Sequence, residues 1–254
     1  MAVSSKSIIH YTGNINNIKG IINDSSLRLK YCNENIVFDS DDQMSVAFPM
    51  VCFCDLPLSL AKDHITKYGS YGIGFSKEWA RKNQLNPVLY LEQGSTLSIY
   101  LSKQTDKILD AIHSKESFSK EDMDELYKFA HVLGFCKNHI GLLSRKGKKE
   151  IQDYVFYDER EWRYIPSQET LEESEMVVSG PAYAKNKDKF NSKLKGKSLL
   201  FDHNDISYII VKTDKDIPEI VDCIRSKYYN KLPAPTLHKL YTKIISVNQI
   251  RDDF

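Results

Sequence analysis

The chain has 254 residues, which is the length of one large domain or of two small ones. Its 35 Lys and Arg residues almost balance its 34 Asp and Glu residues, so the formal net charge is +1, which excludes a strongly basic nucleic-acid coat protein and a strongly acidic tail protein. Hydrophobic residues make up 41% and charged residues 27%, and these are the proportions of a globular protein rather than a disordered one.

The cysteines and the N-terminus indicate a reduced compartment. Five cysteines without framework spacing argue against a secreted disulfide scaffold. The first ten residues lack an apolar core, so we expect no signal peptide, and the longest apolar stretch, 46–54, is far shorter than the roughly 20 residues that span a bilayer. Cys52 and Cys54 have no second ligand pair, so we expect buried packing and no metal site. We therefore expect a cytoplasmic protein that has no membrane partner.

The hydrophobic pattern of the N-terminal part predicts short strands and helices joined by one long polar loop. In chain order we expect a strand at 7–12, a helix at 15–22, a polar loop at 33–45, a buried strand at 50–54, a helix opened by Pro57, a strand at 71–76, a short helix at 77–84 and a strand at 88–91.

The C-terminal part begins with a helical stretch. In chain order we expect a helical pair at 97–139 whose second helix starts with a capping box at Ser119, strands at 154–157 and 161–165, a charged loop with six lysines at 185–197, a strand at 208–212, a helix at 216–229 and a strand at 244–247. No strand–helix unit repeats with the regularity of a doubly wound sheet. We predict one α+β domain over 1–254, with a mixed, mostly antiparallel sheet and a helical insertion at 97–140.

The first segment that could carry chemistry is His10-Tyr11-Thr12-Gly13 on the opening strand. A histidine there can donate from one ring nitrogen while the other is held by its surroundings. The alternative is a hydrogen-bonded core histidine.

The second segment runs from His64 to Ser76 and combines an imidazole, Tyr68 and Tyr71 with a glycine-rich turn. Gly69 and Gly72 would let a flat ligand approach the backbone, but a tight helix–strand turn with an aromatic core explains the same residues. The glycine-rich run follows a helix and enters a strand, which is the reverse of the dinucleotide-binding fingerprint.

The third segment is 158–164, where strand alternation would place Glu159, Glu161 and Arg163 on one face. Two neighbouring carboxylates favour a raised pKa or a nearby cation, and Arg163 could supply that cation. A surface ladder of ion pairs is the alternative.

These segments belong to an ordered series of motifs that resembles the AbiGi-type abortive phage-infection family. The series covers about residues 8 to 166 and consists of His10 to Gly13 with the Ile-rich helix after it, 50–59, His64, 68–74, 77–79, 86–90 and 159–164. The resemblance implies a role in phage defence, as the antitoxin-like partner of a second, toxic gene product.

A more distant resemblance concerns mechanism. A His-Tyr-Thr strand, an aromatic-lined turn and a late Glu-x-Glu are similar to the ADP-ribosyltransferase fold in its His–Tyr–Glu variety, which implies NAD as the substrate. On that pattern His10 would bind the ribose, Tyr71 or Tyr68 would stack on the nicotinamide, Glu161 would stabilise the oxocarbenium-like transition state and Glu159 would orient the acceptor. The other side chains and backbone positions expected to contact NAD are Tyr11, Thr12, Gly13, Ser76 and Arg163.

Two functions follow as hypotheses. The leading one is an ADP-ribosyltransferase-like phage-defence protein that transfers ADP-ribose from NAD to a macromolecular acceptor, with nucleic acid among the acceptors considered. The alternative is a non-catalytic, antitoxin-like protein that binds and neutralises a partner toxin. Both imply a protein partner, either a cognate toxin or an antitoxin.

Overall fold

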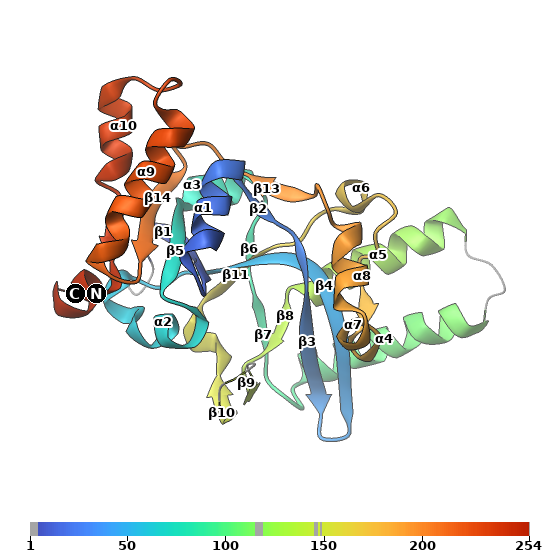
Figure 1. Cartoon of the computed structure of the whole chain (residues 1–254). Coiled ribbons are helices and arrows are strands. Elements are labelled where there is room, and N and C mark those ends of the chain that lie inside the picture. Colours follow the sequence, from blue (N-terminus) through green and yellow to red (C-terminus); the bar gives the residue numbers. More distant parts are fainter. Residues whose placement is uncertain (1–4, 115–118, 145–146, 148, 254) are drawn as a thin grey trace.

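The structure is a computed structural model that describes residues 5–114, 119–144, 147 and 149–253. These residues form a mixed α+β structure around a nine-stranded, mostly antiparallel sheet (Figure 1). The main strand order is β15 (Ile244–Ser246), β14 (Ile206–Val211), β5 (Tyr71–Ser76), β1 (Ser7–Thr12), β4 (Asp42–Cys54), β11 (Glu161–Tyr164) and β6 (Asn86–Pro87), and β3 (Lys30–Asp39) and β12 (Val178–Ser179) also pair with β4. The expected α+β class and the mostly antiparallel sheet are confirmed.

Three two-stranded sheets and a set of helices complete the described part of the chain. The strand pairs are β2 (Ser26–Arg28) with β13 (Ser198–Leu200), β7 (Leu89–Leu91) with β8 (Cys136–Asn138), and β9 (Ile140–Leu143) with β10 (Ile151–Val155). The α-helices are α1 (Ile15–Asp24), α2 (Lys62–Tyr68), α3 (Lys77–Lys82), α4 (Thr96–Ser114), α5 (Lys120–Gly134), α6 (Gln168–Leu171), α7 (Gly180–Lys185), α8 (Lys187–Lys193), α9 (Ile217–Tyr228), α10 (Ala234–Tyr241) and α11 (Val247–Asp253), and the 3-10 helices are η1 (Leu58–Leu60), η2 (Phe156–Glu159) and η3 (Asp214–Asp216). Over the described residues, no helix is both long enough and apolar enough to cross a membrane.

The strands β1 and β4 connect the three candidate segments within the sheet. The last four residues of β4 pair with β11, and Cys54 at its end also lies opposite Ile9 of β1. The first half of β4 pairs with β3 along one edge and with β12 along the other. The strand β5 pairs with the other edge of β1. One sheet therefore contains β1, β4, β5 and β11, as the buried strand patterns predict.

The two faces of this sheet are covered by different helices. On one face Phe53, Phe75 and Trp79 pack in the largest core cluster, which also takes in apolar side chains of α1 and α9. On the other face Ile9 and Ile65 belong to a second cluster that contains residues of α2 and α11. A side chain of these strands therefore packs either in the largest core cluster on one face or beside the second cluster on the other face.

The expected polar loop at 33–45 is wrong. These residues lie in a long hairpin made by β3 and β4, which reverses near Ser40. Ile36 and Phe38 are buried, whereas Val37 between them and Asn35 before them are more exposed, so the segment has the period-two pattern of a half-buried strand. The many Asn and Asp residues concealed that pattern because they lie mainly on the exposed face.

Two further expectations need correction. The lysine-rich segment 185–197 is mostly helical and not a loop, because it contains the end of α7 and all of α8 and is anchored by the buried Leu194. The helical pair is confirmed as α4 and α5, and the capping box between Ser119 and Asp122 is present. The end of the predicted insertion is a strand, β8, and positions 115–118 inside it lie outside the described residues.

Candidate functional site

The residues proposed to act together lie on opposite faces of the sheet. Ile9, Cys54 and Glu161 are in register across β1, β4 and β11, and residues in register project to the same face. His10 follows Ile9, so its side chain projects to the other face, where its ring lies 5.8 Å from that of Phe53. His10 and Glu161 therefore do not face a common point in this structure.

His10 is held as a core histidine. Its Nδ1 lies 2.9 Å from the backbone oxygen of Cys52, so the neutral ring donates this hydrogen bond from Nδ1. Burial lowers the pKa of His10, which keeps the ring neutral at neutral pH.

The three residues after His10 contact different parts of the protein. The Tyr11 ring lies 5.0 Å from that of His64, and its buried hydroxyl has no hydrogen-bond partner among the described residues. Thr12 accepts a hydrogen bond of 2.6 Å from the Asn17 side chain at the start of α1, and Gly13 is exposed. Burial raises the pKa of Tyr11, so its hydroxyl stays protonated.

The two candidate tyrosines separate clearly. Tyr68 stacks on His64 with ring centroids 4.2 Å apart, and its hydroxyl donates to the carboxylate of Glu159. Tyr71 points toward η3, directly before α9, where its hydroxyl donates to Asp216 over 3.4 Å. Only Tyr68 is thus connected to the candidate carboxylates.

Ser76 lies at the far end of β5 and caps a helix. Its hydroxyl accepts the backbone N–H of Trp79 at 3.1 Å and begins α3. This is an ordinary N-cap contact, so the structure gives Ser76 a role in helix formation.

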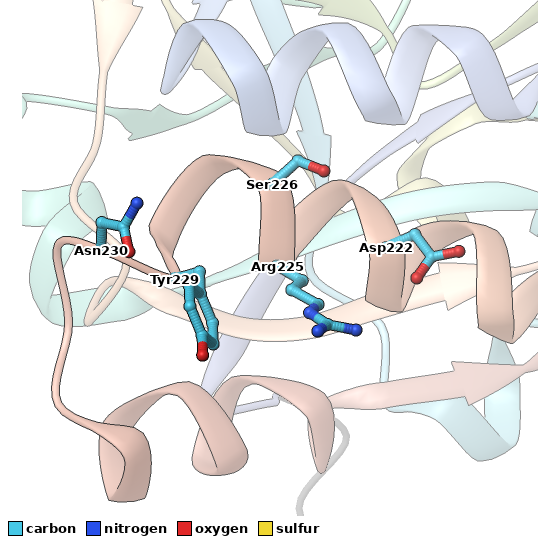
Figure 2. A pocket seen from close by; sticks show the side chains of 5 residues that line it. All are labelled: Asp222, Arg225, Ser226, Tyr229 and Asn230. Atoms are coloured by element: carbon cyan, nitrogen blue, oxygen red, sulfur yellow. The ribbon is translucent and has the colours of Figure 1, made fainter.

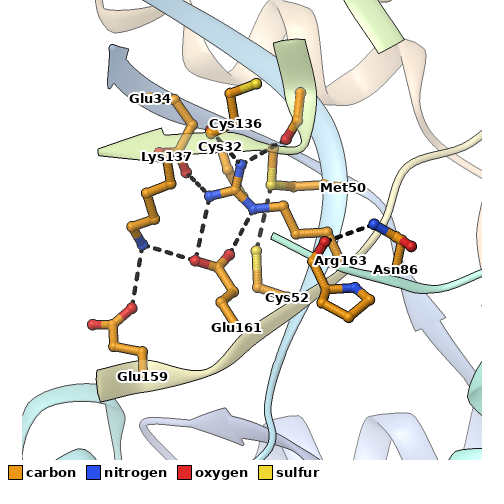
Figure 3. Close-up of polar contacts among 12 residues, drawn as sticks. Cys32, Glu34, Met50, Cys52, Asn86, Cys136, Lys137, Glu159, Glu161 and Arg163 are labelled. Atoms are coloured by element: carbon orange, nitrogen blue, oxygen red, sulfur yellow. Dashed lines mark hydrogen bonds and ion pairs between the residues drawn. The ribbon is translucent and has the colours of Figure 1, made fainter. Parts of the chain in front are cut away.

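Glu159, Glu161 and Arg163 do come together, in a buried charge cluster that also contains Glu34 and Lys137 (Figure 3). Arg163 is fully buried, and it donates to Glu161 at 2.8 Å from Nε and to Glu34 at 2.8 Å from Nη2. Lys137 donates to Glu161 at 2.8 Å and to Glu159 at 3.2 Å. We call these five residues the charge cluster.

Backbone and aromatic groups complete the surroundings of the charge cluster. Arg163 also donates to the backbone oxygens of Gly134 at 2.6 Å and Cys136 at 3.3 Å. The backbone N–H of Glu161 donates to the Tyr90 hydroxyl at 2.9 Å. The contacts with Arg163, Lys137 and the Tyr90 hydroxyl together hold Glu161 in place.

The pKa shifts follow from burial and from these contacts. Burial by itself would raise the pKa of Glu161, but Arg163 and Lys137 outweigh it and hold that pKa well below the usual range. Burial raises the pKa of Glu34 above the usual value in spite of Arg163. Glu161 is thus ionised at neutral pH, and the pKa shifts of the two carboxyl groups that Arg163 contacts go in opposite directions.

Strand alternation explains only part of the charge cluster. Glu161 and Arg163 share one face of β11, as predicted, and Arg163 supplies the expected cation. Glu159 lies before the strand in η2, and Arg160 between the two has a left-handed backbone with φ of 47°. The prediction that Glu159 continues the strand is wrong, although its carboxylate still reaches Lys137.

The sequence analysis missed Lys137 and Glu34. Glu34 belongs to the alternating row Cys32, Glu34, Ile36, Phe38, whose members are less exposed than Asn33 and Asn35 between them, so a period-two search of that segment could have found it. Lys137 lies in β8, which has three residues and directly follows a long helix. So short a strand has no periodic signal of its own.

A cavity of about 290 Å³ adjoins the charge cluster at Glu159. Its other lining residues are Leu56, Leu60, Asp63, His64, Lys67, Tyr154, Tyr157, Asp158 and Arg160. It gives a ligand access to the Glu159 side, whereas Glu161 and Arg163 do not line it. Within the described ranges, no group of three or more His, Cys, Asp or Glu side chains is arranged to hold a metal ion.

A second hollow of about 440 Å³ lies on α9 and the two residues that follow it (Figure 2). Its lining residues are Asp222, Arg225, Ser226, Tyr229 and Asn230. None of the predicted site residues lines this hollow.

The fold and the charge cluster define an α+β protein whose central carboxylate is fully paired with buried cations. Residues 25–212 match the model of the family described as "Putative abortive phage resistance protein AbiGi, antitoxin", and the chain belongs to this AbiGi family. The match continues beyond residue 166, where the motif resemblance ends.

A relative from Lactococcus lactis subsp. cremoris, the abortive phage resistance protein AbiGi, is 27% identical over 221 residues. The alignment covers 81% of this chain and 88% of that protein. No solved structure matches the chain.

Proposed function

We propose that this chain is a non-catalytic, antitoxin-type component of a phage-defence system, which binds and neutralises a toxic partner protein. The pairing of Glu161 carries the proposal. Its two carboxylate oxygens accept hydrogen bonds from Arg163 and Lys137, so the candidate catalytic group is occupied inside the protein. The family description as an antitoxin agrees with a binding role.

The physical argument concerns what Glu161 would have to do as a catalyst. A catalytic carboxylate must be free to stabilise charge that develops only in the transition state. Glu161 instead compensates two buried cations, and removing it would leave Arg163 and Lys137 without much of their counter-charge. The charge cluster therefore serves to fix β11, β8 and β3 against one another.

A second candidate function is transfer of ADP-ribose from NAD to a macromolecule, in an ADP-ribosyltransferase-like fold. The cavity beside Glu159 supports it, because it would admit a ligand next to the residue expected to orient the acceptor. The opposed faces of His10 and Glu161 weigh against it, since one NAD molecule must contact both.

The test is co-expression with the toxic partner. A candidate toxin gene is expressed from an inducible promoter, and growth is measured with and without the chain. We expect the chain to restore growth and to co-purify with the gene product as a complex. The purified chain, supplied with NAD, should release no nicotinamide.

Two results would contradict the proposal. One is a folded, soluble chain that neither restores growth nor binds the gene product. The other is nicotinamide release by the wild-type chain that falls about 100-fold in a Glu161→Gln variant with unchanged melting temperature, because this is the size of effect expected from loss of one electrostatic stabiliser.

A further inference from the structure

The helices α4 and α5 form an arm that extends away from the sheet (Figure 1). The arm is attached at its base, where Leu101, Ala130 and Leu133 are buried in the core clusters. Beyond the base, Leu109 is 44% exposed and Leu126 is only half-buried, and neither belongs to a core cluster of the described residues. A helix that does not bury its apolar side chains is weakly stable, so the arm has surface to offer to another protein.

The outward side of α4 carries two apolar side chains followed by two lysines. Leu97, Tyr100, Lys103 and Lys107 follow one another at spacings of three, three and four residues, which places them in one row along the helix. Leu97 is 45% and Tyr100 58% exposed, and both lysines are exposed. Within the described part of the chain, neither lysine forms an ion pair.

The outward side of α5 carries the complementary row in reverse order. Glu121, Glu125, Lys128 and Val132 follow at spacings of four, three and four residues. All four are exposed, and Lys128 forms an ion pair of 2.5 Å with Asp124 of the same helix. Neither glutamate forms an ion pair among the residues that the structure describes, although Glu125 helps to stabilise the charge of Lys128 on the same helix.

We propose that two copies of this chain associate through their arms, with α4 of each copy packed antiparallel against α5 of the other. At 1.5 Å per residue the row on α4 is about 15 Å long and the row on α5 about 16 Å, so the two match in length. The antiparallel arrangement brings together Leu97 with Val132, Tyr100 with Lys128, Lys103 with Glu125 and Lys107 with Glu121 of the second copy.

A second copy fits this surface because the two complementary rows belong to one chain. A twofold axis parallel to the arm sets each α4 against the other copy's α5, and both contacts form at once. In the dimer two α4–α5 contacts form, in which the exposed apolar side chains lie between the paired helices and the charged pairs fix the register. The proposal goes beyond the antitoxin function and does not depend on it.

Charge reversal tests the pairing. The first variant carries Lys103→Glu and Lys107→Glu, and the second carries Glu121→Lys and Glu125→Lys. Sedimentation velocity of the wild-type chain should show a dimer that weakens as salt is raised. Each variant alone should associate at least about tenfold more weakly, because like charges then face one another in both contacts.

The equimolar mixture of the two variants is the decisive sample. In the mixed dimer, one contact joins the new glutamates at positions 103 and 107 to the new lysines at positions 121 and 125, and the other contact is that of the wild type. Both contacts are attractive, so association should recover to the wild-type level. A control with Lys231→Glu and Lys239→Glu changes the net charge of the chain equally, on exposed lysines away from the arm, and should leave the dimer unchanged.

The proposal is overturned by any of three results. A wild-type chain that is still monomeric at about 100 μM, where weak specific interfaces are already occupied, excludes the arm as a self-association surface. A dimer that the Lys103→Glu and Lys107→Glu variant leaves intact excludes this pairing, and so does a mixture of the two folded variants that stays monomeric. Circular dichroism confirms folding, which these exposed positions should not affect.

Discussion

Lys137 compensates two buried carboxylates at once, those of Glu159 and Glu161. Burial would lower the pKa of Lys137, but Glu161, Glu34 and Glu159 raise it well above the usual value, so the ammonium group is charged at neutral pH. An arrangement of this kind is sensitive to loss of one member, because the charges left behind remain buried.

We therefore expect Lys137→Met to destabilise the protein by about 3–5 kcal/mol, the usual cost of breaking a buried ion pair. Lys193→Met is the matched control, because Lys193 forms an exposed ion pair with Glu175 outside the charge cluster and the arm, so its midpoint should stay close to that of the wild type. Urea denaturation of the three chains measures both differences. Equal midpoints for Lys137→Met and the wild type would show that the charge cluster contributes little to stability.

The same residues show how far a sequence can predict a site. Glu161 and Arg163 were predictable as neighbours because they are two apart on one strand. The pairing of Glu161 with Lys137 depends on β8 lying next to β11, which is a tertiary contact and leaves no trace in the local pattern. The opposed faces of His10 and Glu161 likewise follow from the register of three strands, which no single segment specifies.

At the scale of elements, the turn between α2 and β5 depends on one glycine. Gly69 has φ of +136°, and a Cβ atom placed there would lie 2.2 Å from the backbone oxygen of Thr12. The glycine-rich run was predicted to admit either a ligand or a tight turn, and the close approach at Gly69 comes from the chain's own strand β1.

Gly69→Ala should accordingly destabilise the protein by at least about 2 kcal/mol, since a backbone clash is added to an unfavourable φ. Gly20→Ala in α1 is the contrasting variant: nothing lies within 4 Å of its added Cβ, and alanine favours the helix, so stability should rise by about 0.5–1 kcal/mol. Thermal unfolding followed by circular dichroism distinguishes the two. A tolerated Gly69→Ala would mean that β1 and the turn can move apart freely.

Strands with a clear apolar period and helices with caps were predictable from the sequence. The helix at α5 was predicted correctly since its capping box at Ser119 is local chemistry. The β3–β4 hairpin was missed because its exposed face is so rich in Asn and Asp that composition outweighed alternation. The helix α8 was missed for a similar reason, as lysines hide the anchoring contact of Leu194.

At the scale of the whole molecule, we expect the sheet to fold without the outer part of the arm, residues 106–126. Replacing residues 106–126 with a short Gly/Ser linker removes outer residues such as Leu109 and Leu126 and spares the buried base of both helices. The deletion must not reach β8, because Lys137 belongs to the charge cluster.

We expect the shortened chain to melt within a few degrees of the wild type, since few core contacts are lost, and to sediment as a monomer. Differential scanning calorimetry and sedimentation velocity provide the two measurements. A large drop in melting temperature would place the outer arm within the folding core, and a shortened chain that is still dimeric would place the self-association surface elsewhere.

Because β4 pairs with strands from distant parts of the chain, it cannot complete its pairing until late in translation. One edge of β4 is closed by β11 and β12, whose residues are translated more than a hundred positions after Cys54. At ribosomal speeds of roughly 5–20 residues per second, this edge waits on the order of ten seconds for its partner strands. During that time a largely apolar strand of the nascent chain has one edge open, and the protein is then most exposed to aggregation, chaperones and proteases.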